Sequence, residues 1–178
     1  MNRKEGNHAP IVVGYDGSES AKGAIEQAGE LFGGRPAVVL YAWEAIELSA
    51  LRRGAIGMSA TANEAELDAA AEATARRVAE EGAALARRSG LSAASARAAL
   101  AEPSAWETLV RAADEEEAAA IVLGSRGLSG LRSFMLGSVS DKVAQHARRP
   151  VLIVPSGPLA EARRELSARH ADRAPGLT

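Results

Sequence analysis

The chain has 178 residues, of which 47% are hydrophobic and 25% charged, and this length and composition fit one soluble globular domain with a single core. Its formal net charge of -2 gives no basic field of the kind that attracts nucleic acid or an anionic membrane, so we expect neither as a partner. Cysteine is absent, which excludes disulfides, thiolate metal sites and a cysteine nucleophile.

We expect residues 1–9 to be a disordered terminus, because they are charged and carry no apolar segment. The apolar run that follows them is short and ends at Asp16. Neither a secretion signal nor a membrane span is therefore expected, and the default expectation is a cytoplasmic location.

The first predicted element is a strand at 10–16, whose continuous apolar run is typical of a strand covered on both faces of a parallel sheet. A helix follows, and its apolar face holds Ala21, Ala24, Ile25, Ala28 and Phe32. The next strand is predicted at 36–43. Residues 44–62 then form a long link of mixed composition, compatible with a mobile flap.

A longer helix is predicted at about 63–89, and its apolar face holds Leu67, Ala71, Thr74, Val78, Gly82 and Leu85. The segment 94–100 alternates weakly and is expected to be an edge strand. Strands at 118–124 and 150–155 follow, each preceded by a helix. The apolar faces of these two helices hold Trp106, Leu109, Val110 and Ala113 in the first, and Val139, Val143 and Ala147 in the second.

This alternation predicts an α/β fold, an open five-stranded parallel sheet of the Rossmann-like kind with helices on both faces and the strand order 3-2-1-4-5. Ligands of such sheets bind beyond the carboxyl ends of the strands, where the strand order reverses. The first and fourth strands both end in glycine-rich turns, GYDGSES and GSRGLSG, which would face one crevice. Residues 157–178 follow a Pro-Ser-Gly-Pro break and are expected to be an extension that contains a short amphipathic helix.

The glycines after the fourth strand have the spacing Gly124-x2-Gly127-x9-Gly137-Ser138. Glycine lets an anionic ligand approach backbone N–H groups that a side chain would shield. Ser138 followed by Asp141 three residues later matches a capping box, so a helix is predicted to begin there with its N–H groups aimed at the glycines. The stretch therefore predicts a phosphate site. The alternative is that the glycines only form turns and Ser138 only caps the helix.

On these residues the chain resembles the nucleotide-binding universal stress proteins, whose motif Gly-x2-Gly-x9-Gly-Ser/Thr falls on Gly124, Gly127, Gly137 and Ser138 without a gap. The opening IVVGYDGSESAKGAIEQA and the terminal strand RRPVLIVP are also similar to the family. The resemblance covers residues 10–156, which we expect to be one universal stress protein domain of the adenine nucleotide alpha hydrolase type.

The resemblance implies that Asp16 and Gly17 contact the adenosine part of ATP and that Ala42 meets the adenine through its backbone. It further implies that the ribose and phosphates are held by Gly124, Gly127, Gly137, Ser138 and Val139. Arg126 stands where the family usually has histidine, and an arginine there could pair with a phosphate. Arg132 and Lys142 are further candidates, although such residues are usually just solvated.

Two of these residues have a purely structural alternative. Asp16 could cap the first helix, with Glu19 completing a capping box, whether or not a ligand binds. Trp43, at the end of the second strand, could lie near the base or simply contribute to packing.

Motifs of efficient phosphoryl transfer are missing from the sequence. It has no GxxxxGK[ST], HRD or DFG motif, and the three histidines lack the spacing of metal ligands. We therefore expect a binder with at most slow ATP hydrolysis rather than a true enzyme, with no catalytic or metal-ligating residues, and with Mg²⁺ arriving on the ATP phosphates. His146 is explained as a favourable charge near a helix C-terminus.

The resemblance also implies a homodimer joined through the strand at 150–155, in a stress-response protein whose nucleotide occupancy regulates an unknown protein partner. Two alternatives stay open: a nucleotide-free interaction scaffold of the same fold, and a nucleotide-activating transferase.

Overall fold

A computed structural model describes residues 9–44, 64–126 and 136–157. In chain order its elements are β1 Ile11–Gly14, α1 Glu19–Phe32, β2 Pro36–Trp43, α3 Glu64–Arg88, β3 Ser92–Leu100, α4 Ala105–Glu115, β4 Ala120–Gly124, α5 Ser138–His146 and β5 Val151–Val154. Every predicted strand and helix of the core is present. The expected link at 44–62 and both expected terminal segments lie outside the described residues, apart from their innermost positions.

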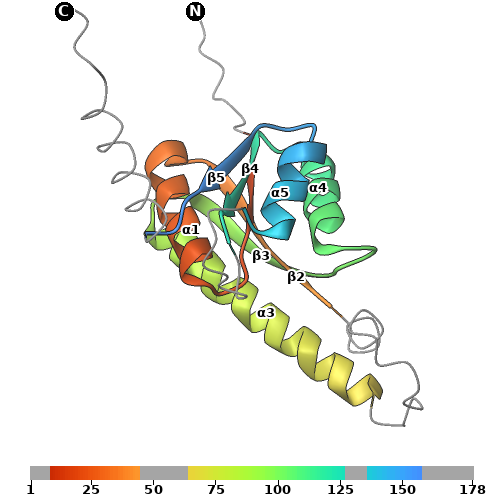
Figure 1. Ribbon diagram of the computed structural model, residues 1–178. Helices are drawn as coiled ribbons and strands as arrows, with labels where there is room; N and C mark the ends of the chain where they lie inside the picture. Colours follow the sequence, from red (N-terminus) through yellow and green to blue (C-terminus); the bar gives the residue numbers. More distant parts are fainter. Residues whose placement is uncertain (1–8, 45–63, 127–135, 158–178) are drawn as a thin grey trace, which may run out of the picture.

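The five strands form one sheet in the order β3-β2-β1-β4-β5, and every neighbouring pair is parallel (Figure 1). The predicted fold class and strand order are confirmed. Because β1 and β4 are adjacent in the middle of the sheet, the turns after Gly14 and Gly124 leave it side by side. This is the point where the strand order reverses and where sheets of this kind bind ligands.

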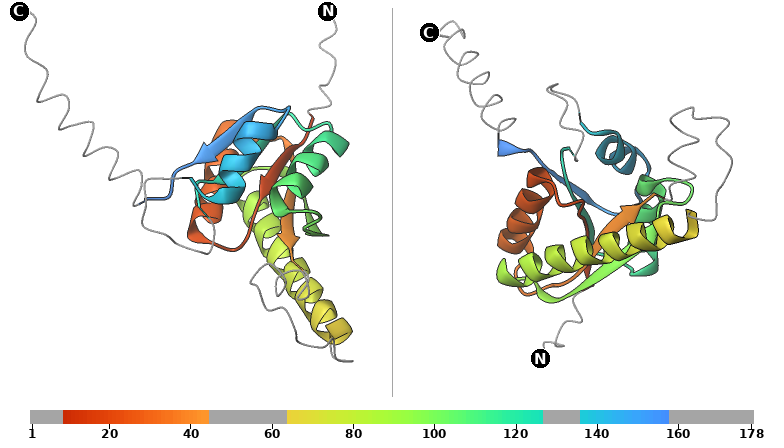
Figure 2. Two further views of the ribbon diagram at one scale, coloured as in Figure 1. Left: turned by 45° about the vertical axis from the view of Figure 1, so that its right-hand side comes forward. Right: turned by 90° about the horizontal axis from the view of Figure 1, so that it is seen from below.

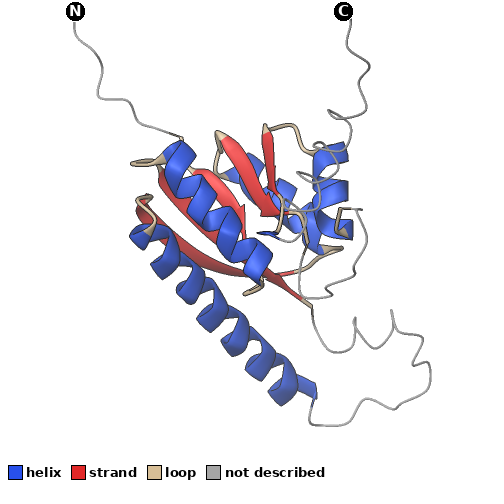
Figure 3. Ribbon diagram, turned by 60° about the vertical axis from the view of Figure 1, so that its left-hand side comes forward, coloured by secondary structure: helices blue, strands red, loops and turns tan. Residues whose placement is uncertain are grey.

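The described helices lie in two layers, one on each face of the sheet (Figure 2). One core cluster joins the sheet to α1 and α3, and a second joins it to α4 and α5. Figure 3 shows the strands between these layers. Since both faces are covered, β1 and β4 are buried along almost their whole length, which explains their continuous apolar sequences.

The buried face of α3 agrees with the predicted one at Gly82, which is buried, but otherwise differs from it. Four alanines, Ala75, Ala79, Ala83 and Ala86, are fully buried, whereas Thr74 of the predicted face is exposed. The larger Val78 and Leu85 are only partly buried at the border of this face. Alanine carries little apolar weight in a sequence pattern, so the pattern favoured a face turned toward the larger side chains.

Among the described residues, the outermost strands of the sheet are β3 on one side and β5 on the other, as expected for both. On the β3 side, Arg97 forms ion pairs with Glu115 at 2.8 Å and with Glu116 at 3.6 Å, next to α4. None of the helices among the described residues is both long and apolar enough to cross a membrane.

Candidate functional site

A cavity of about 230 Å³ lies beyond the carboxyl ends of β1, β2 and β4. The described residues that line it come from these three strands, the turns after them and the N-terminal halves of α1, α4 and α5. They are Gly14, Tyr15, Asp16, Ala21, Leu40, Tyr41, Ala42, Ala105, Leu109, Leu123, Gly124, Arg126, Gly137, Ser138, Val139 and Ser140. The cavity therefore occupies the position in the sheet where a ligand site was expected.

Most of the predicted site residues meet in this cavity. Those that line it are Asp16, Ala42, Gly124, Arg126, Gly137, Ser138 and Val139. Gly17 follows Asp16 but is not part of the lining. Lys142 is exposed and does not line the cavity either. Gly127 and Arg132 lie outside the described residues.

Asp16 stabilises the turn between β1 and α1 but does not cap the helix. Its carboxylate accepts a hydrogen bond from the Ser18 amide at 3.0 Å, and the backbone of Gly17 between them has a positive φ of 81°. The N-cap is Ser18, whose hydroxyl accepts from the Ala21 amide at 3.2 Å. The capping box predicted from Asp16 and Glu19 is therefore wrong, because the turn needs two more residues before the helix begins.

The capping box predicted for α5 is also wrong. The N-cap is Gly137, in an extended conformation with no side-chain cap, and Ser138 is already the first helical residue. The amide of Asp141 donates to the Gly137 carbonyl at 2.9 Å. In an α-helix the N–H groups of the first turn have no acceptor within the helix, and here they belong to three cavity-lining residues, Ser138, Val139 and Ser140. The positive end of α5 thus faces the cavity without a side-chain cap.

The start of α4 also reaches the cavity, through Ala105, but its N-terminus is capped. The N-cap Ser104 accepts a hydrogen bond from the Glu107 amide at 3.4 Å and donates one to the Glu107 carboxylate at 3.0 Å. Both helices carry a carboxylate in the first turn, Glu107 in α4 and Asp141 in α5, so the difference between the two helix starts is the side-chain cap, which α4 has and α5 lacks. Of the two helix starts, that of α5 is the one suited to an anionic ligand.

The first glycine of the motif has a structural reason that sequence analysis missed. A Cβ on Gly124 would lie 2.5 Å from the Ser20 hydroxyl oxygen and 2.7 Å from backbone atoms of Ser20. Glycine is therefore required here because α1 packs directly against the end of β4. The same Ser20 hydroxyl accepts from the Arg126 amide at 3.3 Å, which fixes the direction in which the chain leaves the strand.

Contrary to expectation, the amide of the last glycine of the motif does not face a ligand. The Gly137 amide donates to the Ser125 carbonyl at 2.8 Å, so this donor is used within the protein. The Ser140 hydroxyl donates to the Gly124 carbonyl at 2.7 Å. These two hydrogen bonds hold the start of α5 against the end of β4. The amides that face an anion are consequently those after Gly137.

An apolar wall completes the cavity, and its residues were not predicted as part of a site. It is made by Leu40, Leu109 and Leu123, each at most 4% exposed. Tyr41 lies beside them, and burial, followed by the negative charge of Asp16, raises its pKa. Their positions at the carboxyl ends of β2 and β4 and on the inner face of α4 are the signal that could have identified them.

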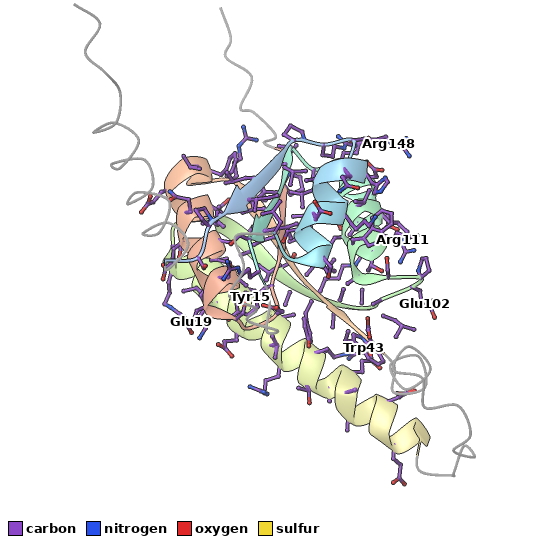
Figure 4. All side chains as sticks on the ribbon, in the orientation of Figure 1. Tyr15, Glu19, Trp43, Glu102, Arg111 and Arg148 are labelled. Carbon is purple, nitrogen blue, oxygen red and sulfur yellow. The ribbon has the colours of Figure 1, made fainter. Side chains whose placement is uncertain are left out.

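Trp43 is not part of this wall. Figure 4 shows Tyr15 near the carboxyl end of β1 and Trp43 at the far end of β2. The Trp43 carbonyl accepts a hydrogen bond from the Ala101 amide at 2.7 Å. Trp43 is not among the residues that line the cavity. The possible place of Trp43 near a bound base is not supported by this geometry.

The described residues offer little to a resident metal ion. They contain no group of three or more histidine, cysteine, aspartate or glutamate residues able to hold one. Asp16 is the single carboxylate among the described lining residues. A divalent cation at this site would need most of its oxygen ligands from a ligand and from water.

Comparison with known proteins gives the family. Residues 8–155 match the model of the family described as the universal stress protein family. Universal stress protein YxiE of Bacillus subtilis is 60% identical over 42 residues, which is 24% of this chain and 28% of that protein. The aligned part is thus less than a third of that relative.

Solved structures resemble the whole core. The structure of protein MJ0577 of Methanocaldococcus jannaschii superposes with a TM-score of 0.66 at 21% identity, covering 83% of this chain and 96% of that one. A universal stress protein solved in complex with cAMP superposes with a TM-score of 0.60 at 26% identity, covering 85% of this chain and 100% of that one.

Proposed function

The chain belongs to the universal stress protein family, and from that premise we propose that it binds ATP in the cavity between Asp16 and the start of α5. We further propose that it acts as a cytoplasmic, homodimeric stress-response regulator whose nucleotide occupancy is read by a protein partner.

One observation carries the nucleotide proposal: the uncapped N-terminus of α5 and the carboxylate of Asp16 open into the same cavity. The α5 N–H groups, together with the positive end of the helix dipole, favour phosphate oxygens. A carboxylate suits the hydroxyl groups of a ribose, because it accepts hydrogen bonds strongly. The polar groups that line the cavity therefore match the two polar parts of a nucleotide.

The apolar wall supports an aromatic base in the same cavity. Leu40, Leu109 and Leu123 offer a dry surface, and the nearby Ala42 leaves room for a ring to approach the backbone of β2. The relative solved with cAMP holds an adenine nucleotide, and at 26% identity it supports the same ligand class here. We propose that Gly17, Gly127 and Arg126 assist at the phosphates and ribose.

The proposed activity is binding, with hydrolysis slow at most. Rapid phosphoryl transfer needs a positioned base or water and a cationic clamp around the γ-phosphate. Among the described lining residues the charged side chains are Asp16 and Arg126. Mg²⁺ would be carried by the phosphates and water, because Asp16 alone cannot form an octahedral site.

Calorimetric titration of nucleotide-free protein with ATP and Mg²⁺ tests the proposal. We expect saturable binding of one ATP per chain, and mass analysis of small molecules released from freshly purified, denatured protein should find an adenine nucleotide. Absence of saturable binding at millimolar ATP would overturn the proposal and favour the nucleotide-free scaffold. Rapid steady-state turnover would instead favour an enzyme.

The proposed dimer uses β5, which has β4 as a neighbour on one side and no described strand on the other. Its four residues are only half-buried although all are apolar. An edge of this kind can pair with a second copy of itself across a two-fold axis. Pro150 and Pro155 flank the strand and limit the length of such a ladder.

A further inference from the structure

Ser125 directly follows β4 and is buried, with 1% of its surface exposed. Its backbone N–H donates to the Val154 carbonyl at 2.7 Å, and its carbonyl accepts from the Gly137 amide at 2.8 Å. Its hydroxyl accepts from the Ser156 amide at 3.1 Å. One residue thus binds both the start of α5 and the end of β5.

The bond to Gly137 connects Ser125 to the candidate site. Gly137 is the N-cap of α5, and the next residues carry the amides that face the cavity. A ligand held by those amides must fix the position of the α5 start relative to β4. Because the Ser125 carbonyl, directly after β4, accepts the hydrogen bond from the start of α5, ligand binding restrains Ser125 as well.

The other two bonds connect Ser125 to β5. The bond to the Val154 carbonyl continues the parallel ladder in which Gly124 pairs with Val154. The hydroxyl reaches one step farther, to Ser156, where the chain has already left the strand. The two backbone bonds would remain without the hydroxyl, so the side chain serves the contact with Ser156.

We propose that Ser125 is a positioning residue that couples the ligand site at the start of α5 to the chain leaving β5 at Ser156. Ligand binding tightens the hydrogen bond between Ser125 and Ser156, and the order of the chain at Ser156 in turn raises ligand affinity, since such coupling is reciprocal. The inference rests on the proposed nucleotide binding and deepens it by naming the part of the surface that responds.

Hydrogen exchange of single backbone amides, measured by NMR on the full chain with and without saturating ATP and Mg²⁺, tests this coupling. In the unchanged protein we expect ATP to slow exchange of the Ser156 amide by roughly fivefold or more. In Ser125→Ala the hydroxyl acceptor is gone, so ATP should no longer slow exchange at Ser156 while still slowing it at Val139. If Ser125 had a structural role alone, Ser125→Ala would change the exchange rate of the Ser156 amide in the absence of ATP, but ATP would still slow that exchange.

Thr108→Ala provides the control. Thr108 is also buried, and its hydroxyl bonds to the carbonyls of Leu100 and Glu102 beside the start of α4, away from β5. This variant should lose stability and yet keep the ATP response at Ser156.

Calorimetry on the same samples separates the possible failures. If ATP binds and exchange at Ser156 does not change, or if Ser125→Ala keeps the response, the coupling is refuted and the proposed function stands. If ATP does not bind at all, the proposed function fails and the coupling fails with it.

Discussion

The hydroxyl of Ser140 donates a hydrogen bond to the carbonyl of Gly124, 2.7 Å away, and both residues are buried. The bond ties the first turn of α5 to the end of β4. The start of the helix is thus positioned by a side chain from within the helix, while its N-cap Gly137 contributes backbone contacts alone.

Ser140→Ala should lower the free energy of unfolding by about 1 to 2 kcal/mol, because the buried Gly124 carbonyl loses its side-chain partner. Urea unfolding measures this change. Ser138→Ala is the matched control, since Ser138 is exposed, provides no side-chain cap and should change stability by less than about 0.5 kcal/mol. Equal effects of the two variants would contradict the assigned bond.

Gly124→Ala should lower stability by about 1 to 3 kcal/mol, because the new methyl group would overlap Ser20, including its backbone. Gly23→Ala, in α1, should instead raise stability by about 0.5 to 1 kcal/mol, since no atom lies within 4 Å of its Cβ position and alanine favours a helix. Thermal or urea unfolding compares them. If the two variants changed stability in the same direction and by similar amounts, close packing of α1 on β4 would not be the reason for glycine at position 124.

Asp16→Ala should weaken ATP binding roughly ten- to hundredfold, because a charged acceptor in the cavity is lost. Part of the change comes from the turn, since the Ser18 amide loses its acceptor as well. Asp16→Asn keeps an oxygen for Ser18 and removes the charge, so it isolates the contribution to binding. Glu19→Ala, with a highly exposed side chain, should leave ATP affinity unchanged in the same calorimetric titration.

Tyr15 should titrate above its ordinary value of 10.0, because burial, followed by the charge of Glu81, raises its pKa. The unfolded chain then loses this proton at a lower pH than the folded one. The stabilising contribution of Tyr15 is therefore complete below about pH 10 and is lost as the pH rises through the raised pKa.

Ultraviolet titration can measure this, because the chain contains only 2 tyrosines and the pKa of the other, Tyr41, is also raised by burial. Tyr15→Phe should leave the single transition of Tyr41. Glu81→Gln should bring the pKa of Tyr15 partly back, since burial is the larger cause. A normal tyrosine titration in the unchanged protein would refute the assigned burial.

Ile153→Glu should convert the proposed dimer to monomers, because two-fold pairing of β5 brings the two introduced charges close together. Ile153 is half-buried and belongs to neither described core cluster, so the fold should tolerate the change. Sedimentation equilibrium measures the mass. Leu31→Glu, at a position on α1 that is 58% exposed, is the control and should remain dimeric.

Most of the fold was predictable because apolar runs and helical periodicity report burial directly. The strands of this sheet are continuous apolar runs, and their order follows from right-handed crossovers and the position of the glycine-rich turns. The face of α3 was not predictable in the same way. Its contact surface is made of alanines that look alike on every side of a helix, so only the partner surface decides which of them are buried.

The candidate site was predictable from the positions of its polar residues but not from its hydrogen bonds. Asp16 and Gly137 line the cavity as the topology suggested, yet α1 and α5 are each capped at a different residue from the one the sequence favoured. A capping box is a local pattern, and here the direction of the preceding turn decides which residue caps. The need for glycine at 124 depends on Ser20, which is remote in the sequence.

The alanine face of α3 has a consequence for how this half of the core responds to change. An alanine side chain has no rotamers, so Ala75, Ala79, Ala83 and Ala86 lose no side-chain entropy on folding and cannot rearrange to absorb a larger neighbour. On the helix side, much of the contact with the sheet is therefore made by methyl groups. Gly82 continues this surface, where even a methyl group would lie 2.6 Å from the ring of Tyr15. The helix and the tyrosine beside Asp16 are consequently packed without room for an added methyl group at position 82.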